Sequence, residues 1–247
     1  MAKNGILLTG GSGTRLGKIS QSFNKHMVPI NDKFVIDYPL QTLKSMGIEN
    51  LTVVLGGNHF EQIVKYLKGG KDFGMNINFL YQENPLGIAN AISLCQRYVE
   101  DECTFTTILG DNFFLNPITW DNKYDNPFMG KIALYKHPSP YRFGVASIDK
   151  TNKIRKIEEK PKTLDNDLDH YAITGCYQFN QDYFEYYKKL KPSPRGEFEV
   201  AEIIQYYLKN NDLQHYIIDG EWSDCGEFES ISHVRELVKN GITKENS

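Results

Sequence analysis

Short apolar runs alternate with amphipathic segments through the first half of the chain. The runs end at glycine or polar residues, as strands commonly do before a loop. Between them, apolar residues recur at three- and four-residue spacing, the period of a helix buried on one face. Strands that alternate with helices predict right-handed crossovers and a mostly parallel sheet. The predicted strands are Ile6–Leu8, Leu51–Leu55, Ile77–Tyr81 and Phe105–Leu109; the predicted helices are Tyr38–Met46, Phe60–Leu67 and Ile88–Tyr98.

The second half of the chain has a different pattern. Its strand-like runs follow one another with only short links, which predicts antiparallel additions to the sheet. No repeat, low-complexity tract or linker interrupts the chain, so we expect one domain over residues 1–240 and a polar, frayed tail over residues 241–247. The predicted strands are Ile132–Tyr135, Phe143–Ile148 and Tyr171–Phe179; the predicted helices are Tyr183–Leu190, Phe198–Leu208 and Ser230–Val238.

Composition excludes several classes of protein. The 247-residue chain has a net charge of −3 and a sequence pI of about 6.1, which gives no general basic field for nucleic acid. No stretch of about twenty apolar residues occurs, so we expect a soluble cytoplasmic protein without a membrane partner. The four cysteines lack C-x-x-C spacing and the six histidines lack zinc-site spacing, which favours reduced, structural thiols and no zinc.

Glycines follow the first, second and fourth predicted strands. They are Gly10 and Gly11, then Gly56 and Gly57, then Gly110. Ligands bind beyond the carboxyl ends of the strands in parallel sheets of this kind. We therefore expect the segments after these strands to line a single crevice.

The first of these segments almost fits two nucleotide-binding motifs. A dinucleotide-binding G-x-G-x-x-G begins at Gly11, but Leu16 occupies the third glycine position. A P-loop ending at Gly17-Lys18 has Ser12 in place of its first glycine and Ile19 in place of its hydroxyl residue. Each motif therefore lacks a residue that it requires: the third glycine in the first motif, and the first glycine and the hydroxyl residue in the second.

The remaining residues of this segment favour an anion-binding loop. Gly10, Gly11 and Gly13 let backbone N–H groups turn towards an anion. Arg15 adds a guanidinium fork and Lys25 a point charge, both suited to phosphate. A glycine-rich turn with a solvated arginine is the alternative, and the glycines alone do not decide between the two.

Two further stretches carry candidate chemistry. Gln82 precedes Pro85 and Gly87 just before a predicted helix, and its amide suits the imide edge of thymine or uracil. Asp111 follows a strongly apolar strand, where a carboxylate is placed to bind Mg²⁺. A surface turn at a helix start is the alternative for the first stretch, and an Asp-Asn turn for the second.

The run Ile157–Pro161 is rich in charge. Its glutamates and Lys160 could equally form a solvated surface run. Pro161 restricts the residue before it, so we expect Lys160 to be extended, which helps to point its side chain inward.

Taken in order, these stretches resemble the sugar-1-phosphate nucleotidylyltransferase family. The opening G-G-x-G-T-R-L with its later lysine resembles the family signature, and further stretches match Q-x-x-P-x-G-[LI]-A-x-A, [YF]-G-V, E-E-K-P and R-G-E-x-E. Thr174-Gly175 matches the end of the family's V-T-G, with Ile173 in place of the valine. The resemblance covers about residues 3–240 and is strongest to glucose-1-phosphate thymidylyltransferases. It implies a Rossmann-like three-layer fold, with a nucleotide-binding half over about residues 1–115 and a sugar-phosphate-binding half over about residues 116–240.

The resemblance also implies roles for individual residues. Arg15, Lys25 and Lys160 would be catalytic, and Asp111 and Asp224 would hold Mg²⁺. The implied nucleotide-binding residues are Gly10, Gly11, Gly13, Thr14, Gln82, Pro85, Gly87 and Asp111. The implied sugar-phosphate-binding residues are Gly144, Glu159, Lys160, Gly175 and Arg195.

The implied reaction joins a sugar 1-phosphate to a nucleoside triphosphate, most directly glucose 1-phosphate to dTTP, for nucleotide-sugar and polysaccharide biosynthesis. A cytidylyl- or uridylyltransferase acting on another phosphorylated acceptor, and a nucleotide sensor without turnover, remain alternatives. His26 stands where the family usually has glutamine, and Ala201-Glu202 replaces Thr-Asp. The sequence ends at Ser247, so we expect a short form without the family's C-terminal extension, and a homodimer stays open.

Overall fold

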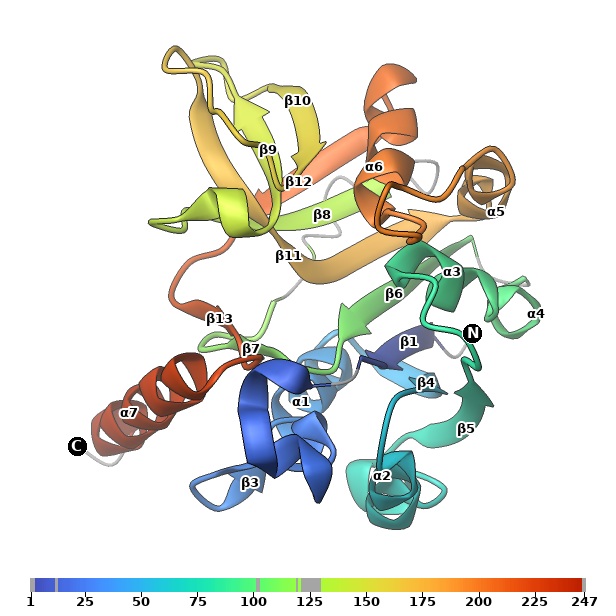
Figure 1. Cartoon of the computed structure of the whole chain (residues 1–247), viewed down its shortest axis with the longest axis vertical. Coiled ribbons are helices and arrows are strands. Elements are labelled where there is room, and N and C mark those ends of the chain that lie inside the picture. The colour runs from blue at the N-terminus through green and yellow to red at the C-terminus, as the bar shows by residue number, and fades with distance from the viewer. Residues whose placement is uncertain (1–2, 12, 101–102, 119, 121–129, 246–247) are drawn as a thin grey trace. The chain divides into compact units, whose positions relative to one another are not determined.

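The computed structural model describes residues 3–11, 13–100, 103–118, 120 and 130–245, with residues 241–245 described through their backbone only. The chain forms two compact units, which are interleaved along the sequence (Figure 1). The first unit contains residues 1–85, 108–119 and 219–247, and the second contains residues 86–107 and 120–218. Strand β6 (Thr104–Leu109) carries the chain from the second unit into the first.

The first unit contains parallel strands in the order β1 (Lys3–Thr9), β4 (Ile48–Leu55) and β5 (Asn76–Tyr81). Residues 5–9 and 51–55 are all buried, which is the pattern of strands covered on both faces. The predicted parallel arrangement is therefore confirmed. The other elements of this unit are η1 (Thr14–Gln21), η2 (Lys25–Met27), β2 (Pro29–Ile30), β3 (Lys33–Phe34), α1 (Asp37–Ser45), α2 (Phe60–Leu67), η3 (Lys71–Phe73), β7 (Asn112–Phe114), β13 (Trp222–Asp224) and α7 (Phe228–Glu245).

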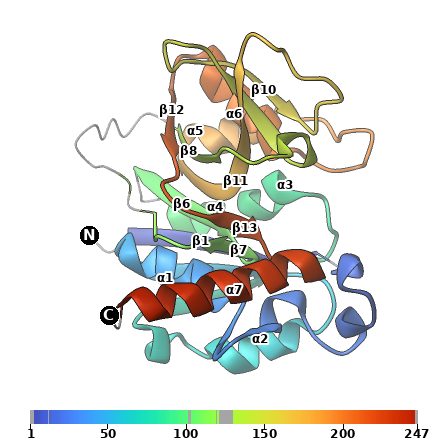
Figure 2. The ribbon, with the colours of Figure 1, turned by 90° about the vertical axis from the view of Figure 1, so that its left-hand side faces the viewer.

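One core of the first unit joins segments from opposite ends of the sequence. Leu16 is fully buried in a cluster with Ile231 and Val234 of α7. In the same cluster, the rings of Tyr38 and Phe113 meet edge to face at 5.0 Å. Figure 2 shows α7 running across this unit near β7 and β13. The helix extends to Glu245, so residues 241–245 of the expected polar tail are helical.

The second unit is built mainly from antiparallel strands. Their order is β10 (Ile154–Glu159), β9 (Gly144–Ile148), β11 (Asp169–Asn180), β8 (Gly130–Tyr135) and β12 (Leu213–Ile217). Only β12 among them pairs in parallel, with β8. The predicted antiparallel additions are confirmed, whereas β10 and β12 were not predicted as strands. The helices of this unit are α3 (Ile88–Ser93), α4 (Gln96–Val99), η5 (Pro140–Arg142), α5 (Asp182–Tyr187) and α6 (Val200–Lys209).

Aromatic side chains fill the core of the second unit. Phe179 stacks on Tyr207 at 5.5 Å between ring centroids and lies 5.0 Å from Tyr183. The hydroxyl of Tyr207 donates to Asn180 Oδ1 at 2.7 Å, which satisfies its only buried polar atom. The core side chains of α6 recur at three- and four-residue spacing, which is why this segment is helical: Val200, Ile203, Ile204 and Tyr207.

Several predicted helices have different limits in the structure, such as α5, which spans Asp182–Tyr187 and not Tyr183–Leu190. The segment 88–98 is divided into α3 and α4 around Cys95. Helix α6 begins at Val200 and not at Phe198, because the backbone of Phe198 is bonded elsewhere. Its N–H donates to Leu86 at 2.8 Å and its carbonyl accepts from Ala89 at 3.2 Å.

Candidate active site

Glycines at the ends of three strands meet in the first unit. A Cβ atom at Gly57 would lie 2.4 Å from the carbonyl oxygen of Gly11, and one at Gly56 would lie 3.3 Å from Gly10 Cα. The N–H of Gly110, directly after β6, donates to a carbonyl of β1 at 2.8 Å. The segments after these three strands are therefore neighbours within this unit, whereas the expectation that they line one crevice stays a prediction. A side chain at Gly56 or Gly57 would meet backbone, so glycine at these positions permits the close approach of the two loops.

Lys25 and Asp111 form a close ion pair beside this loop. Lys25 Nζ lies 2.6 Å from Asp111 Oδ2, and the two side chains are only 17% and 15% exposed. A Cβ atom at Gly11 would lie 3.3 Å from the same Nζ, so the ammonium group lies against the loop backbone. Burial acts to raise the pKa of Asp111, but the charge of Lys25, together with neighbouring charge and hydrogen bonds from Lys25 and Asn112, holds that pKa well below its usual range. The carboxylate is therefore ionised.

Asp224 is brought beside Asp111 by the pairing of β13 with β7. Asp224 lies opposite Asn112, and the N–H of Cys225 donates to the carbonyl of Asp111 at 2.7 Å. The two predicted metal ligands thus come from neighbouring segments of the first unit. Two carboxylates completed by phosphate oxygens and water are a usual ligand set for Mg²⁺, so the donor chemistry fits that ion.

Arg15, in η1, pairs with a residue that the sequence analysis did not single out. Arg15 Nη1 lies 2.8 Å from Glu227 Oε1. A Cβ atom at Gly226 would lie 3.4 Å from Arg15 Nη2 and 3.5 Å from Asp224 Oδ2, so the guanidinium and that carboxylate border the same glycine. The only sequence signal for Glu227 is its position three residues after a predicted metal ligand.

Gln82 lies next to the glycine loop. A Cβ atom at Gly10 would lie 3.6 Å from Gln82 Oε1, which places the predicted base-reading amide beside the predicted triphosphate loop. Thr14 and Pro85 also belong to this first unit, whereas Gly87 belongs to the second. Gly87 has a φ of +95°, and a Cβ atom there would lie 2.8 Å from the carbonyl oxygen of Phe198. Local packing therefore requires glycine at this position.

Gly144 and Glu159 face each other across β9 and β10 in the second unit. A Cβ atom at Gly144 would lie 3.2 Å from Glu159 Oε2, so the glycine leaves room for the carboxylate. Burial, together with nearby Glu199, raises the pKa of Glu159 above its ordinary value, although two cations act in the opposite direction. A partly buried carboxylate beside bare backbone is suited to accepting hydrogen bonds from hydroxyl groups.

Lys160 does not have the predicted conformation. Its φ is +44°, in the left-handed region, so the expectation of an extended residue before Pro161 is wrong. The chain turns where β10 ends, and the N–H of Lys160 donates to Phe143 at 3.0 Å, which holds the turn. The side chain is half exposed, with Nζ 3.8 Å from Glu159 Oε1.

Arg195 is surrounded by carboxylates of the second unit. Arg195 Nη2 lies 2.9 Å from Glu199 Oε1, 3.3 Å from Glu159 Oε1 and 3.6 Å from Glu197 Oε2. The structure therefore brings Arg195 to the predicted sugar-binding Glu159. Gly175 is buried in β11, within an irregularity of the pairing between β11 and β8.

His26 is a buried side chain. It is 1% exposed, its Nδ1 lies 2.8 Å from Asn24 Oδ1, and a Cβ atom at Gly110 would lie 2.8 Å from its Cδ2. Burial, followed by the charge of Lys25, lowers the pKa of His26 to about 3. The imidazole is therefore neutral at physiological pH and packs beside Gly110.

This shift predicts acid sensitivity. Below pH 6.5 His26 is protonated in the unfolded chain, whereas in the folded chain it stays neutral down to about pH 3. The free energy of unfolding therefore falls as the pH falls through this window. Between pH 6.5 and 4.5 the loss should be about 2 kcal/mol more in the wild type than in His26→Gln. Urea unfolding at both pH values measures it. Equal losses in the two proteins would show that His26 does not titrate in this way.

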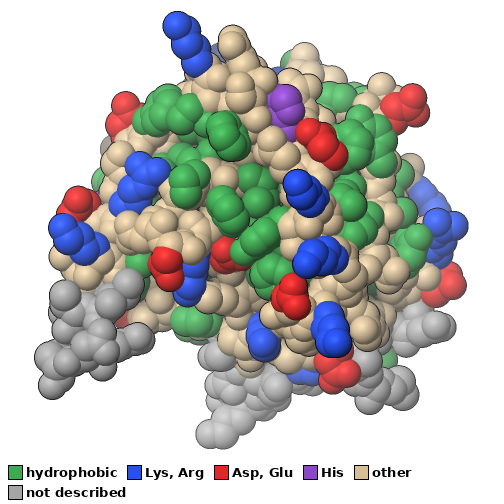
Figure 3. Space-filling view, turned by 90° about the horizontal axis from the view of Figure 1, so that it is seen from below, with side chains coloured by type: hydrophobic (Ala, Val, Ile, Leu, Met, Phe, Trp, Pro, Cys, Tyr) green, Lys and Arg blue, Asp and Glu red, His purple; other side chains and the backbone are tan. Residues whose placement is uncertain are grey.

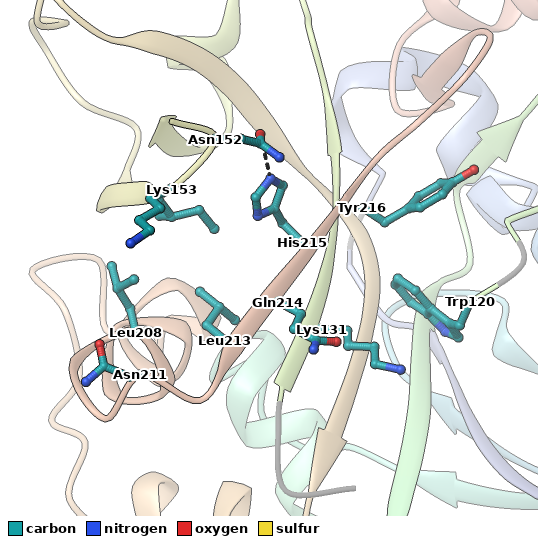
Figure 4. Close-up of a pocket in the computed structure, with 11 residues that line it drawn as sticks. Trp120, Lys131, Asn152, Lys153, Leu208, Asn211, Leu213, Gln214, His215 and Tyr216 are labelled. Atoms are coloured by element: carbon teal, nitrogen blue, oxygen red, sulfur yellow. Dashed lines mark hydrogen bonds between the residues drawn. The ribbon is translucent and has the colours of Figure 1, made fainter. Parts of the chain in front are cut away.

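A separate cavity of about 510 Å³ lies in the second unit (Figure 4). Trp120, Lys131 and Lys153 are among its lining residues, and Asn152 there is hydrogen-bonded to His215 at 3.1 Å. None of the predicted site residues lines it. The candidate site residues are therefore those near Asp111 in the first unit and those near Glu159 in the second unit, and none of them belongs to this cavity.

Charged side chains of both signs are mixed on one face of the molecule. On the face shown in Figure 3, Lys and Arg side chains are interspersed with Asp and Glu and do not gather into one basic patch. Among the described residues, no helix is long and apolar enough to cross a membrane. All four cysteines are free thiols, as predicted.

The sequence matches the nucleotidyl transferase family over residues 4–241, and the chain belongs to that family of enzymes. It is similar to a glucose-1-phosphate thymidylyltransferase of Mycolicibacterium smegmatis, with 33% identity over 95% of this chain and 82% of that protein. It is also 33% identical to the low-salt glycan biosynthesis nucleotidyltransferase Agl11 of Haloferax volcanii, over 95% of this chain and 65% of that protein. The family resemblance read from the motifs is confirmed.

Solved structures agree on the fold. A Bacillus anthracis protein assigned as a glucose-1-phosphate thymidylyltransferase, crystallised with sucrose, superposes with a TM-score of 0.85 at 36% identity, covering 96% of this chain and 95% of that one. A UDP-glucose pyrophosphorylase bound to UDP-glucose superposes with a TM-score of 0.83 at 22% identity, covering 97% and 99%. The second likeness concerns the fold alone. The predicted α/β fold class is confirmed.

Proposed function

We propose that this enzyme joins a nucleoside triphosphate to a sugar 1-phosphate with release of pyrophosphate, most directly dTTP and glucose 1-phosphate to form dTDP-glucose. The observation that carries the proposal is the Lys25–Asp111 pair, 2.6 Å apart, lying against the backbone of Gly11. A cation, an ionised carboxylate and the backbone of a glycine-rich loop meet there. This combination suits a metal-bound polyphosphate better than any neutral ligand.

In this proposal the first unit binds the nucleotide. The loop at Gly10, Gly11, Gly13 and Thr14 wraps the phosphates, with Arg15 and Lys25 as their cations. Asp111 and Asp224 would hold Mg²⁺, which supplies charge neutralisation at the phosphates when bound. Gln82 reads the base, because its amide offers the donor and the acceptor that the imide edge of thymine needs. Its position beside Gly10 supports this role.

The second unit binds the sugar phosphate in this proposal. Glu159 accepts hydrogen bonds from sugar hydroxyls, with the backbone of Gly144 and Gly175 lining the sugar. Lys160 and Arg195 hold the phosphate. The ion pairs of both cations with Glu159 support a shared location within this unit, since they bring anion-binding and hydroxyl-binding groups within 4 Å of each other.

The proposed reaction needs no general base. A sugar-phosphate oxygen, already ionised at neutral pH, attacks the α-phosphorus of the triphosphate. The new P–O bond forms as the bond to the α–β bridging oxygen breaks, and pyrophosphate leaves with that electron pair. The chain's task is to position two anions that repel each other and to neutralise the developing charge. The cations and carboxylates named above serve that task.

A matrix of nucleotides against sugar phosphates tests the proposal. Pyrophosphate release would be measured with Mg²⁺ for dTTP, UTP and CTP, each with glucose 1-phosphate and with other sugar 1-phosphates. We expect the highest rate with dTTP and glucose 1-phosphate. A highest rate with UTP or CTP would transfer the assignment to a uridylyl- or cytidylyltransferase. Tight nucleotide binding without release in any pair would indicate a sensor and overturn the proposed activity.

A further inference from the structure

Arg15, which the proposed function assigns to the triphosphate, forms an ion pair with Glu227 in the structure. The 2.8 Å contact is exposed, with 62% of the Arg15 side chain and 29% of the Glu227 side chain accessible. Exposed pairs of this kind are weak, worth less than about 1 kcal/mol. Guanidinium–phosphate contacts are charge-assisted and often bidentate, so a phosphate can replace the glutamate.

Both partners are fixed at their backbones. Glu227 directly precedes α7, where its N–H donates to Ser230 Oγ at 3.2 Å and that hydroxyl donates back to the Glu227 carbonyl at 2.9 Å. Leu16, next to Arg15, is fully buried against Ile231 of the same helix. The exchange of partners therefore requires only side-chain movement and no opening of the fold.

Charge in this region explains why Glu227 is distinct from the other carboxylates. Asp111 is paired with Lys25, and Asp224 borders the same glycine as Arg15. Two cations thus face three carboxylates. Once Asp111 and Asp224 serve a metal ion, both cations are needed by phosphate, and Glu227 is the carboxylate left without a role in substrate binding.

We propose that Glu227 is a positioning residue that holds Arg15 in the substrate-free enzyme and competes with the phosphates for its guanidinium. Binding of a triphosphate then exchanges one ion pair for another, and Glu227 recaptures Arg15 when pyrophosphate leaves. This inference rests on the proposed function, because it requires Arg15 to be a phosphate ligand. Its consequence is that Glu227 weakens polyphosphate binding and favours release.

Calorimetric binding of dTTP and of pyrophosphate, each with Mg²⁺ and without sugar phosphate, tests the proposal without turnover. Glu227→Gln should bind both about two- to fivefold more tightly than the wild type, the range expected from loss of an exposed competing ion pair. Glu227→Asp retains the charge but is shorter by about 1.5 Å, so it should also tighten binding. Weaker binding by Glu227→Gln would mean that Glu227 supports Arg15 in the complex, and would overturn the proposal.

Matched variants separate contact from general charge. Glu229→Gln removes the same charge two residues further along α7 and should change both affinities by less than about 1.5-fold at 0.15 M salt, because an exposed charge there is screened. An equal effect of Glu229→Gln, or wild-type affinity of Glu227→Asp, would reduce the role of Glu227 to net charge and overturn the proposal.

Arg15→Ala distinguishes this inference from the proposed function. It should weaken dTTP binding about tenfold or more. If Arg15→Ala weakens dTTP binding while Glu227→Gln leaves the affinity for dTTP unchanged, Glu227 does not compete for Arg15, and Arg15 remains a phosphate ligand. If Arg15→Ala has no effect, Arg15 is not a phosphate ligand, and the nucleotide site of the proposed function fails with it. Thermal unfolding of each variant confirms that the compared proteins are folded.

Discussion

Asp111→Asn should lower the rate of pyrophosphate release about 10²–10³-fold while the chain stays folded. Asparagine has nearly the same shape but no charge for a magnesium ion, and it leaves Lys25 without the carboxylate that lies 2.6 Å away. Loss of that pair should lower the free energy of unfolding by about 1–3 kcal/mol. Pyrophosphate release with saturating Mg²⁺ measures the rate. Release at nearly the wild-type rate would contradict the two-aspartate metal site.

Asp37→Asn provides the matched control. Asp37 is another buried carboxylate of the first unit, but its partners are structural: the N–H of Phe34 at 2.7 Å and the hydroxyl of Tyr66 at 2.8 Å. The same isosteric change there should reduce stability and leave the rate within about threefold. An equally large loss of rate in Asp37→Asn would show that the Asp111→Asn effect is structural.

Gly57→Ala should destabilise the first unit by about 2–4 kcal/mol and abolish dTTP binding in the folded fraction. Its φ is +72°, and the added Cβ atom would lie 2.4 Å from the carbonyl oxygen of Gly11. The neighbour is backbone, so relief requires a shift of the glycine loop itself. Denaturant unfolding and calorimetric titration with dTTP and Mg²⁺ measure the two effects.

Gly47→Ala isolates the contribution of the close approach. Gly47 has a φ of +77° in the same unit, but a Cβ atom there meets nothing within 4 Å. Its replacement should cost only the backbone strain, about 1 kcal/mol, and leave dTTP affinity unchanged. If both variants lose the same stability and both bind dTTP, Gly57 does not restrict the loop.

The first-half elements could be predicted because their buried strands are continuous apolar runs, such as residues 51–55 of β4. Strands β10 and β12 could not, because their sequences carry little apolar periodicity. Their strand conformation depends on pairing with β9 and β8, which is information from distant parts of the chain. The backbone conformation of Lys160 could not be predicted for a similar reason. Its hydrogen bond to Phe143, a residue distant in the sequence, outweighs the preference for an extended conformation that Pro161 sets.

The candidate residues of the site could be predicted where a loop motif holds them together, as with Gly10, Gly11 and Gly13. Their charge partners could not. Arg15 and Glu227 are 212 positions apart, and no spacing rule connects them. The contact between Arg195 and Glu159 could not be predicted either, because the two residues are 36 positions apart in the sequence. Ion pairs of this range are set by topology, which a single sequence does not display.

The core that joins Leu16 to Ile231 and Val234 also bears on how the chain is made. The first unit is assembled from three segments, and its last segment begins at residue 219. A ribosome delivers all of the second unit before that segment emerges. The first unit therefore stays incomplete, with Leu16 and its neighbours uncovered, until α7 is synthesised. Closure across more than 200 positions is slow compared with local helix or hairpin formation, which makes completion of this core a late step in folding.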